Sequence, residues 1–422
     1  MENKKVERSW LIRTILFMVG QDVSLLGSSI VQIALIWFVA MKTSSGTWAS
    51  LLTISSTVPQ MLISLFGGAW ADRYNRKLLI IVSDALIALA TLVLAIFLSL
   101  INIDEKSMVV ILFVSIIRSF GAGVQSPAVS AIIPQIVPQQ HLLRINGING
   151  SIQSIIQFIS VPIAGAVLAV GSIVHILMID IATAVIGIAL LLFILIPKHL
   201  VSETTEKENV LQNIKSGIQY IFSDQFLRKL MLTFGFFILL SVPSGFMVTL
   251  LIQRTFGNNY TYFATNGMIG FAGMALGGIL LGAWGGFKNR IKTLFVGLFA
   301  YALFSLAVGM TYEFWLFSIF MFGLGFSIPL VQTATTTIIQ EKAETEYSGR
   351  VFSLLGIMFT GFMPLGMAIF GPLADVIKIQ TMIIACGVAL LVLAVSTFIP
   401  KVFYINGITT TSSQNNSEKG DN

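Results

Sequence analysis

The sequence predicts an all-α integral membrane protein that crosses the bilayer twelve times. Apolar runs of about 20 residues follow one another along the whole chain, and this is the length that spans the hydrocarbon core of a membrane. In addition, 55% of the 422 residues are hydrophobic and only 10% are charged. A soluble domain carries about 25% charged residues and could not bury this much apolar surface.

Breaks rich in charged or turn-forming residues divide the apolar runs into twelve predicted helices. They cover residues 14–40, 47–71, 77–101, 108–132, 146–170, 174–197, 229–253, 263–286, 291–311, 314–338, 350–374 and 378–400. The first run is too long for the core of a signal peptide, so we interpret it as a helix. An even number of crossings places both termini on one side of the membrane.

The lysines and arginines predict which side this is. They gather at the two termini and in every second loop, whereas the alternate loops hold just Lys42, Lys106, Arg254 and Lys378. Because basic residues are retained on the cytoplasmic face, we expect both termini in the cytoplasm. The net charge of +6 follows from this topology and from the anionic inner leaflet, so we expect no nucleic-acid partner.

The chain divides into two similar halves of six predicted helices. The first half covers residues 1–197, a cytoplasmic linker 198–228, the second half 229–400, and a flexible cytoplasmic tail 401–422. Phe120, Gly121, Gly123 and Pro127 recur in the same order as Phe322, Gly323, Gly325 and Pro329. This repetition indicates internal duplication, and two parallel six-helix pseudo-repeats are the architecture of a large class of secondary transporters.

Away from the ends of the predicted helices there are four charged residues, all in the first half: Asp22, Asp84, Arg118 and Asp180. Charge inside a bilayer costs at least about 2.5 kcal/mol, so such residues face a cavity or a partner. Asp22, Asp84 and Arg118 are candidates for proton coupling, because a carboxyl group that alternates between dry and charged surroundings can bind and release a proton. The alternative is a static ion pair that ties the helices together, and Asp22 with Arg118 is the pair that we consider first. Asp180 is expected to reach towards the external headgroups.

Glutamines inside the predicted helices are candidates for lining a substrate cavity: Gln21, Gln32, Gln125, Gln157 and Gln332. A buried amide needs a partner, and a cavity supplies water or ligand. Many phenylalanines add an apolar wall, which a bulky and largely apolar ligand requires. Prolines inside six of the predicted helices would let those helices bend: Pro59, Pro127, Pro162, Pro243, Pro329 and Pro364.

Nothing in the sequence indicates catalysis. Cys386 is the single cysteine, and the three histidines lie far apart, so we expect neither a disulfide framework nor a metal site. No nucleophile–base pair and no phosphate-binding loop is recognisable, so no cofactor is expected. An enzyme is therefore the interpretation that the sequence favours least.

The residues from Gly67 to Lys77, between the second and third predicted helices, resemble the cytoplasmic loop signature of the major facilitator superfamily. The resemblance implies a conformational latch formed by Gly68, Asp72, Arg73, Arg76 and Lys77. A glycine lets helix ends approach, an aspartate accepts hydrogen bonds from a helix N-terminus, and arginines bind carbonyls or carboxylates. The alternative is an ordinary basic turn on the cytoplasmic side.

Within this superfamily the chain is most similar to the macrolide efflux proteins of Gram-positive bacteria and their multidrug relatives. The similar stretches include residues 20–25, Asp84, residues 117–119, 340–342 and 346–354. The resemblance implies a monomer in the bacterial cytoplasmic membrane that exports small hydrophobic compounds, with macrolides as one candidate, by proton antiport. A translocator of lipids or lipophilic metabolites and a non-transporting sensor or scaffold remain as alternatives.

Overall fold

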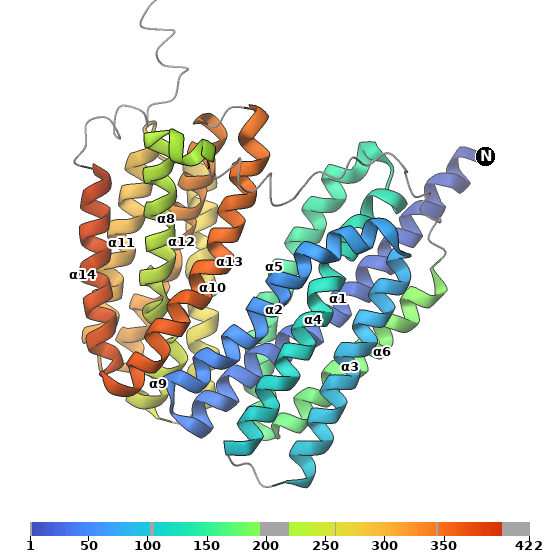
Figure 1. Cartoon of the computed structure of the whole chain (residues 1–422), viewed down its shortest axis with the longest axis horizontal. Coiled ribbons are helices and arrows are strands. Elements are labelled where there is room, and N and C mark those ends of the chain that lie inside the picture. Colours follow the sequence, from blue (N-terminus) through green and yellow to red (C-terminus); the bar gives the residue numbers. More distant parts are fainter. Residues whose placement is uncertain (1, 102–104, 195–218, 258, 343–344, 399–422) are drawn as a thin grey trace, which may run out of the picture. The chain divides into compact units, whose positions relative to one another are not determined.

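The computed structural model describes residues 2–101, 105–194, 219–257, 259–342 and 345–398 (Figure 1). Every regular element within these residues is a helix, which confirms the predicted all-α class. Among the residues described, twelve helical segments are long and apolar enough to cross a membrane, and they correspond to the twelve predicted spans. The predicted linker 198–228 lies largely outside the described residues, and the predicted tail 401–422 lies wholly outside them.

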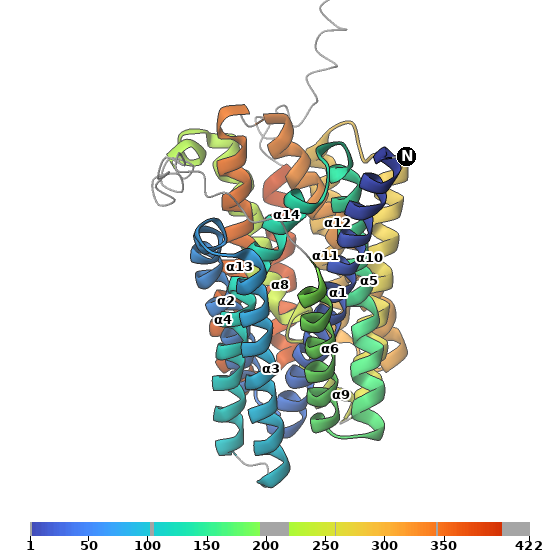
Figure 2. The same ribbon diagram turned by 90° about the vertical axis from the view of Figure 1, so that its right-hand side faces the viewer.

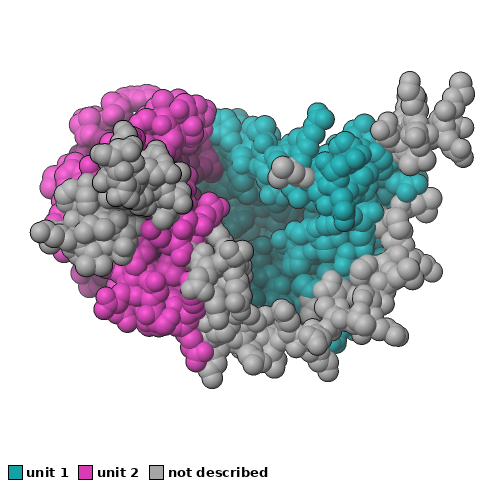
Figure 3. All heavy atoms as spheres, turned by 90° about the horizontal axis from the view of Figure 1, so that it is seen from above, with its two compact units in different colours: residues 1–44, 48–204, 258–264 teal, residues 45–47, 205–257, 265–422 magenta. Residues whose placement is uncertain are grey.

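The chain forms two compact units, which Figure 3 distinguishes by colour: unit 1 comprises residues 1–44, 48–204 and 258–264, and unit 2 comprises residues 45–47, 205–257 and 265–422. The helices of the first half are α1 (Glu2–Thr43), α2 (Gly46–Arg73), α3 (Arg76–Leu100), α4 (Glu105–Ile136), η1 (Gln139–His141), α5 (Leu142–Val170) and α6 (Ile173–Phe193). Those of the second half are α8 (Gln225–Gly245), α9 (Val248–Phe256), α10 (Tyr260–Trp284), α11 (Arg290–Met310), α12 (Phe314–Lys342), α13 (Thr345–Val376) and α14 (Ile379–Phe398).

In unit 1, α1 packs along α6 and α5, and α3 packs against α4 and α6 (Figure 1, Figure 2). One end of this bundle is held by a cluster of buried apolar side chains that includes Phe17, Ile80, Ile132 and Leu191. Large apolar side chains such as Phe113 are in contrast exposed on the outside of the helices. An apolar exterior of this kind is what a bilayer requires, because lipid tails solvate it as well as a protein core would.

The repeated glycines make equivalent contacts in each unit. A Cβ atom on Gly123 would lie 2.8 Å from the carbonyl oxygen of Gln60, and a Cβ atom on Gly325 would lie 2.2 Å from that of Gly270. Neither position has room for a side chain, so α4 meets α2 and α12 meets α10 backbone to backbone. The duplication seen in the sequence therefore reappears as the same helix contact in both units.

The predicted span 229–253 lies within one candidate membrane span, Gln225–Phe256, but this span consists of two helices and not of one continuous helix. α8 ends at Gly245 and α9 begins at Val248, and the N–H groups of Phe246 and Met247 both donate to the carbonyl of Val242, at 2.9 and 3.1 Å. Pro243 lies just before the break and has no N–H to donate to the preceding turn, which weakens the helix at this point. The other five prolines named above lie inside uninterrupted helices.

Candidate functional site

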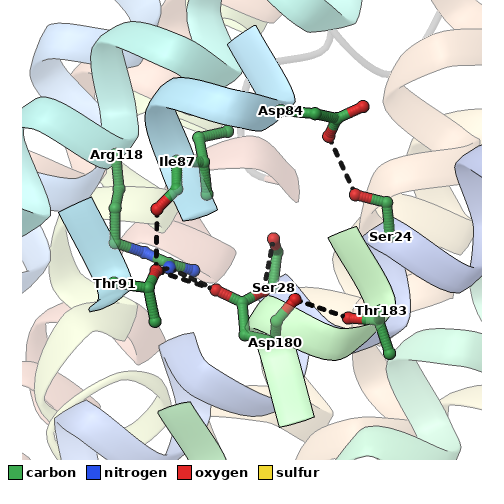
Figure 4. A network of polar contacts seen from close by, with 8 residues as sticks. All are labelled: Ser24, Ser28, Asp84, Ile87, Thr91, Arg118, Asp180 and Thr183. Carbon is green, nitrogen blue, oxygen red and sulfur yellow. Dashed lines mark hydrogen bonds and ion pairs between the residues drawn. The ribbon is translucent and has the colours of Figure 1, made fainter. Parts of the chain in front are cut away.

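Asp84 lies on α3 in the interior of unit 1, where its side chain is almost fully buried. Its Oδ1 atom accepts hydrogen bonds from Ser24 Oγ at 2.8 Å (Figure 4) and from Gln125 Nε2 at 2.7 Å. Gln125 Nε2 also lies 3.4 Å from Gln21 Oε1, so two of the predicted glutamines surround this carboxyl group. Its Oδ2 atom is buried and has no hydrogen-bond partner among the residues described.

The two oxygens of Asp84 thus have different surroundings. A buried carboxylate oxygen without a donor loses its hydration and gains nothing in return, which is costly when the group is ionised. A proton on Oδ2 would remove the charge and leave the two hydrogen bonds to Oδ1 intact. The geometry therefore suits a group that carries a proton in this arrangement of the helices.

Asp180 on α6 forms a second cluster, which includes an ion pair with Arg118 on α4 (Figure 4). Arg118 Nη1 donates to Asp180 Oδ2 and to the hydroxyl oxygen of Thr91. Thr91 Oγ1 lies 3.0 Å from Asp180 Oδ2, and Ser28 Oγ donates to Asp180 Oδ1 at 3.1 Å. Each carboxylate oxygen of Asp180 therefore has at least one donor, in contrast to Asp84.

The expectation that Asp180 reaches towards the headgroups is wrong, because its side chain is fully buried. Three groups in the interior satisfy it, so the carboxylate has no need of the membrane surface. Arg118 is likewise paired with Asp180 and not with Asp22, the partner considered first. Asp22 precedes Ser28 by six residues on α1, which places it about 9 Å along the axis and on a different face of the helix. Asp22 is partly buried and forms no hydrogen bond or ion pair with the described residues.

Gly27 allows α1 to approach α6 beside Asp180. A Cβ atom at this position would lie 1.9 Å from Thr183 Oγ1 and 3.0 Å from the Cα atom of Asp180. Thr183 Oγ1 in turn donates to the backbone carbonyl of Asp180 at 2.9 Å. The cluster around Asp180 therefore depends on the missing side chain at residue 27.

We expect Gly27→Ala to lower the thermal stability of the purified protein, because the added methyl group must push α1 away from α6. Overpacking of this kind costs about 1–3 kcal/mol. The matched control is Gly147→Ala in α5, where a Cβ atom would meet nothing within 4 Å. Equal melting temperatures for the two variants, measured by tryptophan fluorescence, would contradict the proposed role of Gly27.

A cavity of about 80 Å³ lies among α1, α2, α3 and α4 of unit 1. Arg118 lines it together with Gln32, Gln60 and the serines Ser28, Ser56, Ser115 and Ser119. Gln32 is thus the one predicted glutamine that borders this cavity. Gln157 is exposed on α5, and Gln332 lies on α12, where its side chain forms no hydrogen bond with the described part of the chain.

The predicted latch residues lie at the α2–α3 turn. Arg76 Nε donates to the carbonyl of Ala71 and Arg76 Nη1 to that of Ala131 on α4, both at 2.7 Å. Lys77 Nζ donates to the carbonyl of Ile194 just beyond α6, at 2.8 Å. These two cations therefore bind backbone carbonyls near the ends of α2, α4 and α6, where the partial negative charge of a helix favours them.

The other three predicted latch residues are Gly68, Asp72 and Arg73. Asp72 lies in the last turn of α2, which Arg73 ends with an exposed side chain. A Cβ atom on Gly68 would meet nothing within 4 Å, whereas one on Gly67 would lie 2.7 Å from the carbonyl oxygen of Gly123. The close helix approach predicted for Gly68 is therefore made by its neighbour.

Unit 2 contains a charged cluster that the predicted spans did not include. Arg254 Nη2 lies 3.0 Å from Asp375 Oδ1, and the same oxygen accepts from the N–H of Gly46 at 2.6 Å. Asp375 Oδ2 accepts from the N–H and the hydroxyl of Thr47, at 3.0 and 2.7 Å. The helices extend slightly beyond the predicted boundaries and so bring this pair within the candidate spans. In the part of the chain that the structure describes, no group of three or more potential ligands is placed to hold a metal ion.

Sequence reasoning overlooked Ser24, Ser28 and Thr91, although their spacing was a usable signal. Ser24 and Ser28 are four residues apart on α1, and Thr91 follows Asp84 by seven residues on α3. Both spacings place the side chains on one face of a helix. The polar face of α1 and the polar face of α3, which carries Asp84, would have indicated that these two helices face each other.

Comparisons with known proteins agree with the fold. A family model described as Major Facilitator Superfamily matches residues 17–367 and 233–419. Macrolide efflux protein A of Streptococcus pyogenes is 27% identical over 92% of this chain and 95% of its own length, and the multidrug efflux pump Tap of Mycolicibacterium fortuitum is 21% identical over 89% and 93%. Among solved structures, a D-xylose–proton symporter superposes with a TM-score of 0.68 at 13% identity, covering 93% of this chain and 99% of the other.

Proposed function

Because the chain belongs to the major facilitator superfamily, we propose that this multi-pass membrane transporter exports small hydrophobic, drug-like compounds by proton antiport. Export is supported by the relatives named above, which are efflux proteins for macrolides and for multiple drugs. Macrolides are accordingly one candidate substrate. The distribution of lysines and arginines further supports cytoplasmic termini in the bacterial cell membrane.

The proton-coupling part of the proposal rests on one observation: the buried Oδ2 atom of Asp84 has no hydrogen-bond partner among the residues that the structure describes. In our proposal Asp84 holds a proton while it is enclosed, and it releases the proton when movement of the helices exposes the carboxyl group to water. Ser24 and Ser28 lie one helical turn apart on α1 and bond to Asp84 and Asp180 respectively. A movement of α1 would therefore change the surroundings of both carboxyl groups together. In this proposal the Arg118–Asp180 ion pair lies next to this switch and carries no net charge.

Arg76 and Lys77 support a related proposal for the α2–α3 turn. Their bonds to backbone carbonyls of α4 and of the segment after α6 fix the turn within unit 1. In this proposal the turn, with Asp72 at its start, stabilises one conformation of the transport cycle. Gly68 and Arg73 then remain available to contacts that form in that conformation.

We expect a protonophore to abolish efflux from cells that express the protein. One proton that moves inward releases about 2.3 kcal/mol per 100 mV of membrane potential, and collapse of the gradient removes this driving force. The measurement is fluorescent-drug efflux before and after addition of the protonophore. Depletion of ATP with the gradient maintained serves as the control and should leave efflux intact. Efflux that continues without either component of the proton gradient would overturn the antiport proposal.

A further inference from the structure

Four serine hydroxyl groups line the cavity in unit 1, and each of them already donates its proton in a hydrogen bond within the protein. Ser115 Oγ donates to the carbonyl of Ile111 at 2.8 Å, and Ser56 Oγ donates to that of Thr53 at 3.0 Å. Ser119 Oγ donates to the carbonyl of Ser56 at 2.8 Å, and Ser28 Oγ donates to Asp180. A hydroxyl oxygen that has donated its proton still has lone pairs. These serines therefore present hydrogen-bond acceptors to the cavity.

Arg118, Gln32 and Gln60 complement the serines with donors. Both hydrogen bonds of the Arg118 guanidinium are donated by Nη1, so its Nε and Nη2 groups have no acceptor among the residues described. The side chains of Gln32 and Gln60 also form no hydrogen bond within the described chain, and each amide offers two N–H groups and one carbonyl. The wall of the cavity is therefore complementary to a group that both donates and accepts hydrogen bonds.

The charge of the wall argues against an ionic ligand. Asp180 compensates the positive charge of Arg118, so the cavity has no net charge to offer a carboxylate or a phosphate. The serine lone pairs would also repel an anion, and the guanidinium would repel an ammonium group. Apolar side chains such as Leu35, Ile36 and Leu52 form the rest of the wall and suit the carbon skeleton of a ligand.

We propose that this cavity is a subsite for an uncharged, hydroxyl-bearing part of the exported compound, of which a glycosyl ring is the chemical model. Hydroxyl groups donate and accept at once, which matches acceptor serines placed beside donor amides and a guanidinium. A volume of about 80 Å³ is well below that of a drug-sized site, so the cavity would hold only part of the exported compound. The proposal rests on the proposed export function and adds to it a preference for glycosylated over plain apolar compounds.

The test is a binding measurement on the purified full-length protein in lipid nanodiscs, without any proton gradient. The probes are three coumarins with the same ring system: 7-methoxy-4-methylcoumarin, 4-methylumbelliferyl β-glucoside and 4-methylumbelliferyl β-glucuronide. The variants are Gln32→Leu and Gln60→Leu, singly and together, which remove the amides at nearly constant volume. Gln153→Leu, at an exposed position of α5 outside this cavity, is the matched control.

We expect the wild type and the control to bind the glucoside about fivefold more tightly than the methoxycoumarin, as one or two net hydrogen bonds provide. The double variant should reduce this preference to less than about twofold while its affinity for the methoxycoumarin stays unchanged. Equal binding of glucoside and methoxycoumarin by the wild type, or binding of neither, would overturn the proposal. A glucuronide that binds tenfold more tightly than the glucoside would also overturn it and make the cavity an anion site.

The same experiment separates the subsite from the transport function. Binding is measured without a gradient, whereas export is tested by the protonophore experiment above. A retained preference for the glucoside in a protein that fails the protonophore test would refute proton-driven export and leave the subsite standing. Gradient-driven efflux by a protein that shows no preference for the glucoside would refute the subsite and leave proton-driven export standing.

Discussion

Replacement of Asp84 by asparagine is expected to give a folded protein that no longer couples efflux to protons. Asparagine keeps an acceptor for Ser24 and Gln125 and replaces the unpartnered oxygen by an uncharged group, so it imitates the protonated carboxyl. One coupled proton supports a concentration ratio of about 50-fold per 100 mV, and this accumulation should be lost. The measurement is the steady-state ratio of a fluorescent drug across the membrane of energised cells.

Asp22→Asn is the control for this experiment, because it removes the other candidate carboxylate from the first half. Asp22 is partly buried and without a partner among the described residues, so we expect its replacement to leave most of the drug gradient in place. A normal gradient with Asp84→Asn and a collapsed one with Asp22→Asn would exchange the roles of the two residues. Equal protein levels by immunoblot are needed for either conclusion.

Arg118→Ala should have the largest effect on folding. It leaves the Asp180 carboxylate buried without its cation, and the loss of one partner of a buried ion pair costs about 3–5 kcal/mol. Most of the protein should therefore be lost from the folded fraction in detergent. The measurement is the monodisperse peak in fluorescence-detected size-exclusion chromatography.

The double variant Arg118→Ala with Asp180→Ala separates charge from packing. Removal of both charges leaves no stranded carboxylate, so folding should largely recover. Transport should not recover, because the guanidinium next to the cavity is missing. A single Arg118→Ala variant that is as stable as the double would show that the pair contributes little to the fold.

The membrane class, the twelve spans and the duplication could be predicted because each follows from local composition. A run of 20 apolar residues has one stable environment, whatever its neighbours are. The break in the helix after Pro243 was harder to predict than the spans, because five other prolines lie in continuous helices. Whether a proline interrupts a helix depends on what the freed backbone groups find nearby, and this is a property of the packed structure.

The sequence predicted which residues belong to the candidate site better than it predicted the contacts between them. Asp84, Arg118, Gln21 and Gln125 follow from the cost of polar groups in hydrocarbon. The partner of Arg118 could not be predicted in this way, because it depends on which face of α6 meets α4 and α3. Asp180 was assigned to the headgroup region from its distance to the helix end, and three donors from other helices reverse that assignment. Contacts between helices depend on how the helices pack, and they are therefore the feature that a single sequence predicts least well.

In the proposed antiport, Asp84 carries the proton that is released in exchange for the substrate. The most direct test is the release of protons from purified protein in weakly buffered detergent when a transported drug is added, followed with a pH-sensitive dye. The wild type and Asp22→Asn should each release protons on addition of the drug, and Asp84→Asn should release none while still binding it. Release from Asp84→Asn equal to that of the wild type would contradict the claim.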